Sequence, residues 1–193
     1  MAAGTLTLRD AFVGRSSSAR TLAVIVGGAG LIAACAQISI PLGFTPVPVT
    51  GQTFAVLLVG AGLGSAAGTA STLLYVALGA IGLPIYAHHA HGWSVVTSST
   101  GGYLVGFIVA AAVTGTLAER RWDRRFSSSL GAMLTGNIVI EACGAAWLAH
   151  HLHWSMAKSL ELGVYPFVPG DVLKMYLAAA ALPTAWKLAG RRR

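Results

Sequence analysis

The chain has 193 residues, of which 55% are hydrophobic and only 10% are charged, whereas a soluble domain carries about 25% charged residues. No Asp, Glu, Lys or Arg occurs from Thr21 to Ala118, and a water-soluble fold could not present that length without charged surface. The formal net charge of +7 does not indicate nucleic-acid binding, because the basic residues lie at the chain ends and in one short central run. The composition therefore excludes a soluble protein and predicts a membrane protein with several spanning helices.

Several long apolar segments follow a polar start at residues 1–20. A spanning helix needs about 20 residues, and the segments predicted to span the membrane are about residues 21–40, 52–63, 65–83, 100–118, 128–148 and 166–188. The second of these is short for a full crossing, which indicates a tilted or interrupted helix. Gly60, Gly64 and Gly68 recur every fourth residue, so we expect the second and third helices to meet at a tight junction.

Three loops between these segments are expected at the same membrane face. The first, Pro41–Thr50, is called the proline loop here; its prolines remove backbone donors and fix φ, so it is predicted to be a stiff, non-helical lid. The other two carry His-His-x-His groups, at His88–His91 and His150–His153. Clustered imidazoles suit zinc, nickel or copper. No carboxylate or thiolate accompanies them, however, and exposed interfacial histidines explain the same pattern.

The distribution of basic residues predicts the orientation of the bundle. Six spans place both termini and the basic turn 119–125 on one side, together with Lys187, and leave only Lys158 in the loops opposite. Under the positive-inside rule the basic side is cytoplasmic. We therefore predict an all-α membrane protein, a compact bundle of six transmembrane helices with both termini in the cytoplasm. Residues 21–190 form its single substrate-binding domain, between the cytoplasmic segment 1–20 and a basic cytoplasmic tail at 191–193.

Two ionisable residues open the last apolar segment. Asp171 and Lys174 are three residues apart, so a helix places both side chains on one face. Ionisable groups cost about 2.5 to 3.5 kcal/mol each at the bilayer centre, so an intramembrane pair is a functional-site hypothesis. A structural interpretation is equally open, because Pro169 and Asp171 suit the first turn of a helix and Lys174 can pair with Asp171 or extend to the headgroups.

The fifth apolar segment carries Asn137 and Glu141, four residues apart and on one helix face. A buried acid without a basic partner usually stays neutral, so we expect a structural, protonated role for Glu141. Asn137 both donates and accepts hydrogen bonds and is the better ligand candidate. The chain has neither a GxxxxGK[ST] sequence nor an HExxH pair, so we predict that it is not an enzyme and needs no cofactor.

Five motifs occur together in one order along the chain. They are Gln37–Pro41, Thr45–Thr53, Leu78–Pro84, Thr100–Phe107 and Pro166–Lys174. The set resembles the BioY family, the biotin-binding S components of energy-coupling factor transporters, over nearly the whole chain after residue 20. Each motif alone is weakly specific, whereas their ordered combination is specific to this family.

The resemblance implies a protein that captures biotin at the outer face of a bacterial cytoplasmic membrane and delivers it inward by toppling in the lipid bilayer. It implies as partners a transmembrane coupling subunit and two cytoplasmic ATPase subunits. The proline loop is the implied lid over biotin, and Ala29 and Ala33 are implied to contact the coupling subunit. The implied substrate-binding residues are Thr45, Gln52, Tyr103, Asn137, Asp171 and Lys174.

The chain departs from the family pattern at Ser98–Ser99, where a glycine-rich turn is usual, and at Glu141, where an apolar or aromatic residue is usual. The His88–His91 loop also stands where glycines are common. Other functions stay open on the residues alone. A proton-coupled secondary carrier would use Glu141 or Asp171, a metal-ion-binding S component would use the histidine groups, and a structural assembly protein would bind no small ligand.

Overall fold

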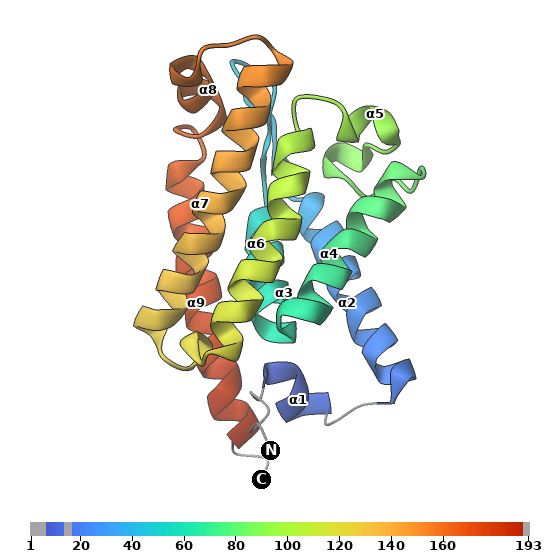
Figure 1. Cartoon of the computed structure of the whole chain (residues 1–193), viewed down its shortest axis with the longest axis vertical. Helices are drawn as coiled ribbons and strands as arrows, with labels where there is room; N and C mark the ends of the chain where they lie inside the picture. The colour runs from blue at the N-terminus through green and yellow to red at the C-terminus, as the bar shows by residue number, and fades with distance from the viewer. Residues whose placement is uncertain (1–6, 14–16, 191–193) are drawn as a thin grey trace.

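The computed structural model describes residues 7–13 and 17–190, which fold into a bundle of helices (Figure 1). In Figure 1, α1 and the end of α9 lie at one end of the bundle, whereas α5 and α8 lie at the other. In chain order the elements are α1 Leu8–Val13, α2 Ser18–Ala36, β1 Ser39–Ile40, β2 Val49–Thr50, α3 Gln52–Leu63, α4 Ser65–Ala80, the 3-10 turn η1 Ala87–His89, α5 Trp93–Val96, α6 Gly101–Glu119, the 3-10 turn η2 Trp122–Arg124, α7 Phe126–His151, α8 Met156–Gly163 and α9 Val168–Gly190.

Helices α2, α3, α4, α6, α7 and α9 occupy the predicted apolar segments. By length and composition, α2, α6 and α7 are long and apolar enough to cross a membrane, and α3 and α4 are shorter apolar helices. Many large apolar side chains are exposed, among them Leu22, Val26, Val105, Val109, Leu134, Ile138, Leu173 and Leu177. An outer surface this rich in large apolar side chains suits a lipid environment better than water.

The predicted end of the first apolar helix is wrong. Helix α2 stops at Ala36, not near Ile40, and β1 pairs antiparallel with β2, with Ser39 opposite Thr50. Pro41 follows directly, and a residue before proline is driven from the helical to the extended region, which suits Ile40 to the β1 strand. The two-strand ladder closes the ends of the proline loop, so the prediction that this stretch is not helical is confirmed.

The polar start of the chain contains helix α1, where no helix was expected. The backbone N–H and the hydroxyl of Thr7 donate to Oδ2 of Asp10 at 3.1 and 2.9 Å, and the Asp10 N–H donates back to the Thr7 hydroxyl at 3.3 Å. This reciprocal pair is a capping box, which satisfies backbone donors at a helix start. Helix α2 likewise begins early, at Ser18 rather than Thr21.

The predicted glycine junction between α3 and α4 is confirmed. A Cβ at Gly68 would lie 2.7 Å from the Gly60 Cα, and a Cβ at Gly60 would lie 2.7 Å from the carbonyl oxygen of Ala111 on α6. Between the two helices, Gly64 adopts a φ of +83°, which residues with a Cβ rarely adopt. Helix α3 has 12 residues, so at about 1.5 Å per residue it is shorter than a bilayer core of about 30 Å.

Ala29 and Ala33, which the family resemblance implies as contacts of the coupling subunit, are packed against the core of the bundle. Ala29 is only 5% exposed and belongs to the core of the bundle, and Ala33 is partly buried against the same core. The helical period explains this, because Ala29 falls on the inner face of α2 with Ile32 and Ala36. The exposed side of α2 presents larger side chains, such as Leu22.

Helix α7 packs against both α6 and α9, and this arrangement positions the site. At the α6 interface, a Cβ at Gly102 would lie 2.6 Å from the carbonyl oxygen of Cys143, so the two backbones approach closely. On its other side α7 presents Asn137 to Asp171 near the start of α9. Polar residues from two apolar segments therefore meet inside the bundle.

Candidate functional site

A pocket of about 270 Å³ is lined in part by residues of α5 and of the start of α6. These segments lie at the end of the bundle away from α1 (Figure 1). Its wall combines the second half of the proline loop, the start of α3, turn η1, the segment from α5 to α6, and residues of α6, α7 and α9. The β1–β2 ladder holds the proline loop against this pocket, because β2 runs straight into α3. Segments far apart in the sequence thus enclose one cavity.

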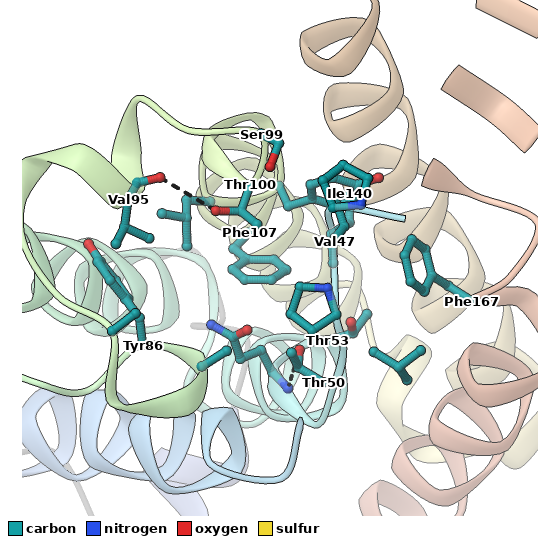
Figure 2. Close-up of a pocket in the computed structure, with 18 of the residues that line it drawn as sticks. Val47, Thr50, Thr53, Tyr86, Val95, Ser99, Thr100, Phe107, Ile140 and Phe167 are labelled. Carbon is teal, nitrogen blue, oxygen red and sulfur yellow. Dashed lines mark hydrogen bonds between the residues drawn. The ribbon is translucent and has the colours of Figure 1, made fainter. Parts of the chain in front are cut away.

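Most of the pocket wall is apolar or aromatic. Figure 2 shows the rings of Tyr86 and Phe167 on opposite sides of the pocket, with Phe107 between them. All three are buried within the protein, so packing fixes the positions of the rings. Val47 from the proline loop and Ile140 from α7 add aliphatic surface. Such a wall suits a ligand with an apolar body and a few polar groups.

One side of the pocket carries a buried ion pair. Asp171 and Lys174 both line it, and Lys174 Nζ donates to Oδ1 of Asp171 at 2.8 Å. The second carboxylate oxygen, Oδ2, accepts from the Asn137 amide at 3.3 Å. Asp171 is 2% exposed and lies in the first turn of α9, where a negative charge is favourable. The functional and the structural interpretations of this pair are therefore compatible.

Further polar residues of the pocket are fixed by hydrogen bonds to the surrounding bundle. The Gln52 amide donates to the Tyr75 hydroxyl at 2.6 Å, and the Tyr103 hydroxyl donates to the carbonyl of Gly163. The Tyr86 hydroxyl donates to the carbonyl of Val76 at 2.6 Å, and burial raises the pKa of Tyr86 to about 12. These side chains are held before any ligand arrives, which lowers the entropic cost of binding.

The structure brings together four of the six residues expected to contact substrate: Gln52, Tyr103, Asp171 and Lys174 line the pocket. Asn137 is not part of the lining and lies behind Asp171, where it acts on the carboxylate instead of facing the cavity. Thr45 is also outside the lining, and its hydroxyl accepts from the Val47 N–H within the proline loop. These two residues are therefore placed to position other residues.

Glu141 lines the pocket, although the sequence suggested a structural role for it. Its carboxyl interacts electrostatically with Asp171 across the α7–α9 interface. The signal was present in the sequence, because Glu141 lies four residues after Asn137 and so on the same face of α7. The spacing alone does not reveal that this face of α7 meets α9 at Asp171, so it could not predict that Glu141 lines a cavity.

The histidine groups do not gather into a metal site. Within residues 7–13 and 17–190 there is no group of three or more His, Cys, Asp or Glu side chains that could hold a metal ion. His88 lines the pocket at its edge, and its Nε2 lies 3.2 Å from the hydroxyl of Ser39. His151 stacks on Trp147 in the last turn of α7. The metal-binding interpretation has no geometric support in this part of the chain.

Comparison with known proteins places the chain among vitamin transporters. The family model described as the BioY family matches residues 9–191. The biotin transporter BioY of Thermotoga maritima is 42% identical over 149 residues, which cover 77% of this chain and 85% of the relative. The biotin transporter BioY of Rhizobium etli is 38% identical over 147 residues, covering 72% and 78%. A crystal structure of the S-component for biotin from an ECF-type ABC transporter is also similar, with a TM-score of 0.80 and 26% identity over 88% of this chain and 92% of that one.

Proposed function

The chain belongs to the BioY family, and on this premise we propose that it is a biotin-binding membrane subunit, the S component of an energy-coupling factor transporter. The observation that carries the proposal is the buried Asp171–Lys174 pair in the wall of an otherwise mostly apolar pocket. Family membership alone would not show that this chain keeps a site able to take the vitamin.

The chemistry of biotin matches this wall. Biotin has an apolar bicycle and an apolar tail, two ureido N–H donors, a ureido carbonyl and a terminal carboxylate. The rings of Tyr86, Phe107 and Phe167 suit the apolar parts, and Asp171 and Lys174 supply an acceptor and a donor. A cavity of about 270 Å³ is slightly below the usual range of about 300 to 1,000 Å³ for ligand sites, which favours a small vitamin over a larger cofactor.

The orientation of the bundle in the membrane and its partner subunits are part of the same proposal. The basic residues Arg120, Arg121, Arg125 and Lys187 lie in or beside η2 and near the end of α9, which is the end away from the pocket. Six helices crossing the bacterial cytoplasmic membrane would then put both termini in the cytoplasm and open the pocket to the outside. A transmembrane coupling subunit and two cytoplasmic ATPase subunits would supply the energy, and the chain itself would catalyse no reaction.

Equilibrium binding of labelled biotin to the purified protein in detergent, without nucleotide or partner subunits, tests the proposal. We expect tight binding near one biotin per chain, displaced by unlabelled biotin and not by an unrelated vitamin such as thiamine. A folded, monodisperse protein that binds no biotin would overturn the proposed function. Uptake by cells that lack the partner ATPases, collapsed by an uncoupler at constant ATP, would instead identify a proton-coupled carrier.

A further inference from the structure

Glu141 has an unsatisfied acceptor in the pocket wall. Its Oε2 atom is buried and has no hydrogen-bond partner. Buried side-chain oxygen and nitrogen atoms without a partner are few in the described part of the chain, and of these Glu141 Oε2 is the one that belongs to a pocket-lining residue. Buried polar atoms in native proteins usually have a hydrogen-bond partner. An acceptor without a donor in a cavity wall therefore indicates that a ligand in the cavity supplies the donor.

The neighbours of Glu141 supply no donor to that oxygen. The Glu141 carboxyl hydrogen-bonds to Asp171, whose carboxylate brings acceptors only, so Oε2 still lacks a donor. Lys174 Nζ donates to Oδ1 of Asp171, and the Asn137 amide donates to Oδ2 of the same residue. Both of these donors point to Asp171, and neither donates to Glu141. The pocket is the open side of the wall, from which a ligand can bring a donor to Glu141.

We propose that Glu141 is a ligand-contacting residue that accepts a ureido N–H of biotin and so sets the direction in which the vitamin lies. The inference rests on the proposed function and deepens it. The ureido ring is the only part of biotin that presents donors, whereas its carboxylate only accepts. Placing the ureido ring at Glu141 satisfies the orphan acceptor and leaves the Asp171–Lys174 pair available to the same ring.

The opposite orientation is disfavoured by charge. Glu141 and Asp171 are the two acidic residues of the pocket wall, and the single ammonium beside them already pairs with Asp171. A ligand carboxylate there would meet the like charge of Asp171 in a poorly solvated site. The rest of the lining, which includes Ser98–Thr100 and His88, contains no acid. The tail carboxylate of biotin is therefore expected among those residues, away from Glu141 and Asp171.

Titration of three ligands against three proteins tests the inference. The proteins are the unsubstituted chain, Glu141→Leu and Glu141→Gln, and the ligands are biotin, biotin methylated on one ureido nitrogen, and biotin methyl ester. Glu161→Leu is the matched control, because it makes the same change at an exposed acid on α8, away from the pocket. Thermal unfolding of each variant in detergent checks that it is folded.

We expect Glu141→Leu to raise the Kd of biotin about ten-fold or more, and Glu141→Gln, which keeps an acceptor oxygen, to raise it less than about three-fold. The methyl ester should show the same loss in Glu141→Leu. At least one singly N-methylated biotin should lose affinity for the unsubstituted chain and show little further loss in Glu141→Leu.

Three outcomes would overturn the inference. Folded Glu141→Leu with unchanged affinity would remove Glu141 from the ligand contacts. A loss seen with biotin but absent with the methyl ester would assign Glu141 to the tail carboxylate and reverse the orientation. A chain that binds no biotin at all would end the proposed function and this inference with it, whereas the first two outcomes leave the proposed function intact.

Discussion

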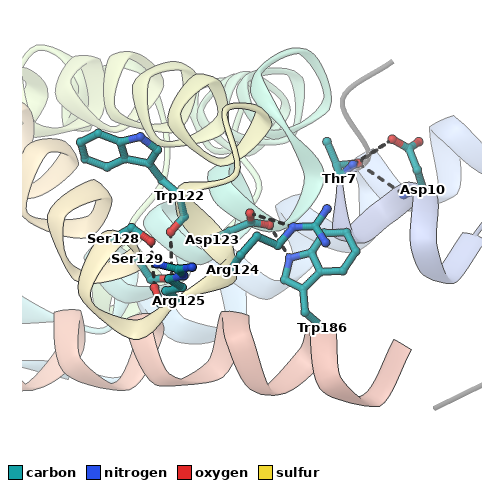
Figure 3. Close-up of polar contacts among 9 residues, drawn as sticks. All are labelled: Thr7, Asp10, Trp122, Asp123, Arg124, Arg125, Ser128, Ser129 and Trp186. Carbon is teal, nitrogen blue, oxygen red and sulfur yellow. Dashed lines mark hydrogen bonds and ion pairs between the residues drawn. The ribbon is translucent and has the colours of Figure 1, made fainter. Parts of the chain in front are cut away.

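Trp186, near the end of α9, donates its indole N–H to the carboxylate of Asp123 in η2, the turn that joins α6 to α7 (Figure 3). Asp123 is 1% exposed, and Nε of the adjacent Arg124 lies 3.5 Å from its second oxygen. The guanidinium of Arg124 also lies 3.2 Å from the centre of the Trp186 ring. These contacts fasten the α6–α7 turn to the last helix at the end opposite the pocket.

Replacing Trp186 by Phe should destabilise the folded protein. It should leave the Kd for biotin unchanged under conditions in which the variant is fully folded. The variant keeps a ring under Arg124 but removes the only indole donor to the buried Asp123 carboxylate, at a cost of about 1 to 3 kcal/mol. Thermal unfolding in detergent measures the change. Trp93→Phe is the control, since Trp93 is 67% exposed, and an equal loss of stability in both variants would contradict the prediction.

The same carboxyl should make stability depend on pH. Burial raises the pKa of Asp123 above its ordinary value of 3.8, although Trp186 and Arg124 act in the opposite direction. An acid with a raised folded-state pKa contributes stability that is full below the unfolded value and is lost as pH rises through the folded value. The melting temperature of the unsubstituted protein, relative to Asp123→Asn, should therefore fall as the pH rises above about 4. A difference that stays constant as the pH rises would contradict this prediction.

Much of this fold follows from local sequence signals. The uncharged stretch from Thr21 to Ala118 predicts membrane helices. The prolines after Ala36 predict a loop and the glycines around Gly64 predict a tight junction, because each of these residues affects the backbone at its own position. The predicted end of α2 was wrong because the residues after Ala36 enter the β1–β2 ladder. This ladder pairs residues about ten positions apart, and a strand of two residues is too short for a recognisable sequence pattern.

Some residues of the site could likewise be predicted from local sequence, whereas others could not. Asp171 and Lys174 are identifiable because a helix spacing puts two expensive charges on one face. Asn137 and Thr45 were expected to contact the ligand and lie outside the pocket lining. For Asn137, only the packing of α7 on α9 decides whether a polar residue faces the cavity or lies behind Asp171. Glu141 was assigned a structural role for the same reason, since its neighbour Asp171 is thirty positions away in the chain.

Removing either member of the buried pair should weaken biotin binding. Asp171→Asn and Lys174→Ala each leave a buried partner without its charged hydrogen bond, so we expect losses of about 1 to 3 kcal/mol, or roughly 5- to 150-fold in Kd. Titration with labelled biotin measures the effect, and Lys187→Ala on the exposed side of α9 is the control. Unchanged affinity with lowered thermal stability in both variants would show that the pair serves only the helix start.

Asn137 should act on the ligand only through Asp171. Because its amide donates to Oδ2 of Asp171 from outside the lining, Asn137→Leu should weaken biotin binding by about 1 kcal/mol when Asp171 is present. In the Asp171→Asn background the same change should cost much less, and a double-mutant cycle measures this coupling. Thr135→Leu, at an exposed position of α7, controls for helix effects. Additive losses would mean that Asn137 meets biotin directly.

Two glycines of α3 provide a matched pair of substitutions that tests the packing of α3 against α6. A Cβ at Gly60 would lie 2.7 Å from the Ala111 carbonyl oxygen, whereas a Cβ at Gly62 would have no atom within 4 Å. Gly60→Ala must therefore push α3 away from α6 at a cost of about 1 to 3 kcal/mol, while Gly62→Ala should be neutral or gain up to about 1 kcal/mol from helix propensity. Thermal unfolding in detergent compares them. Because α3 also carries Gln52 into the pocket wall, Gly60→Ala should lower biotin affinity as well, and equal behaviour of the two variants would show that α3 and α6 are not in close contact.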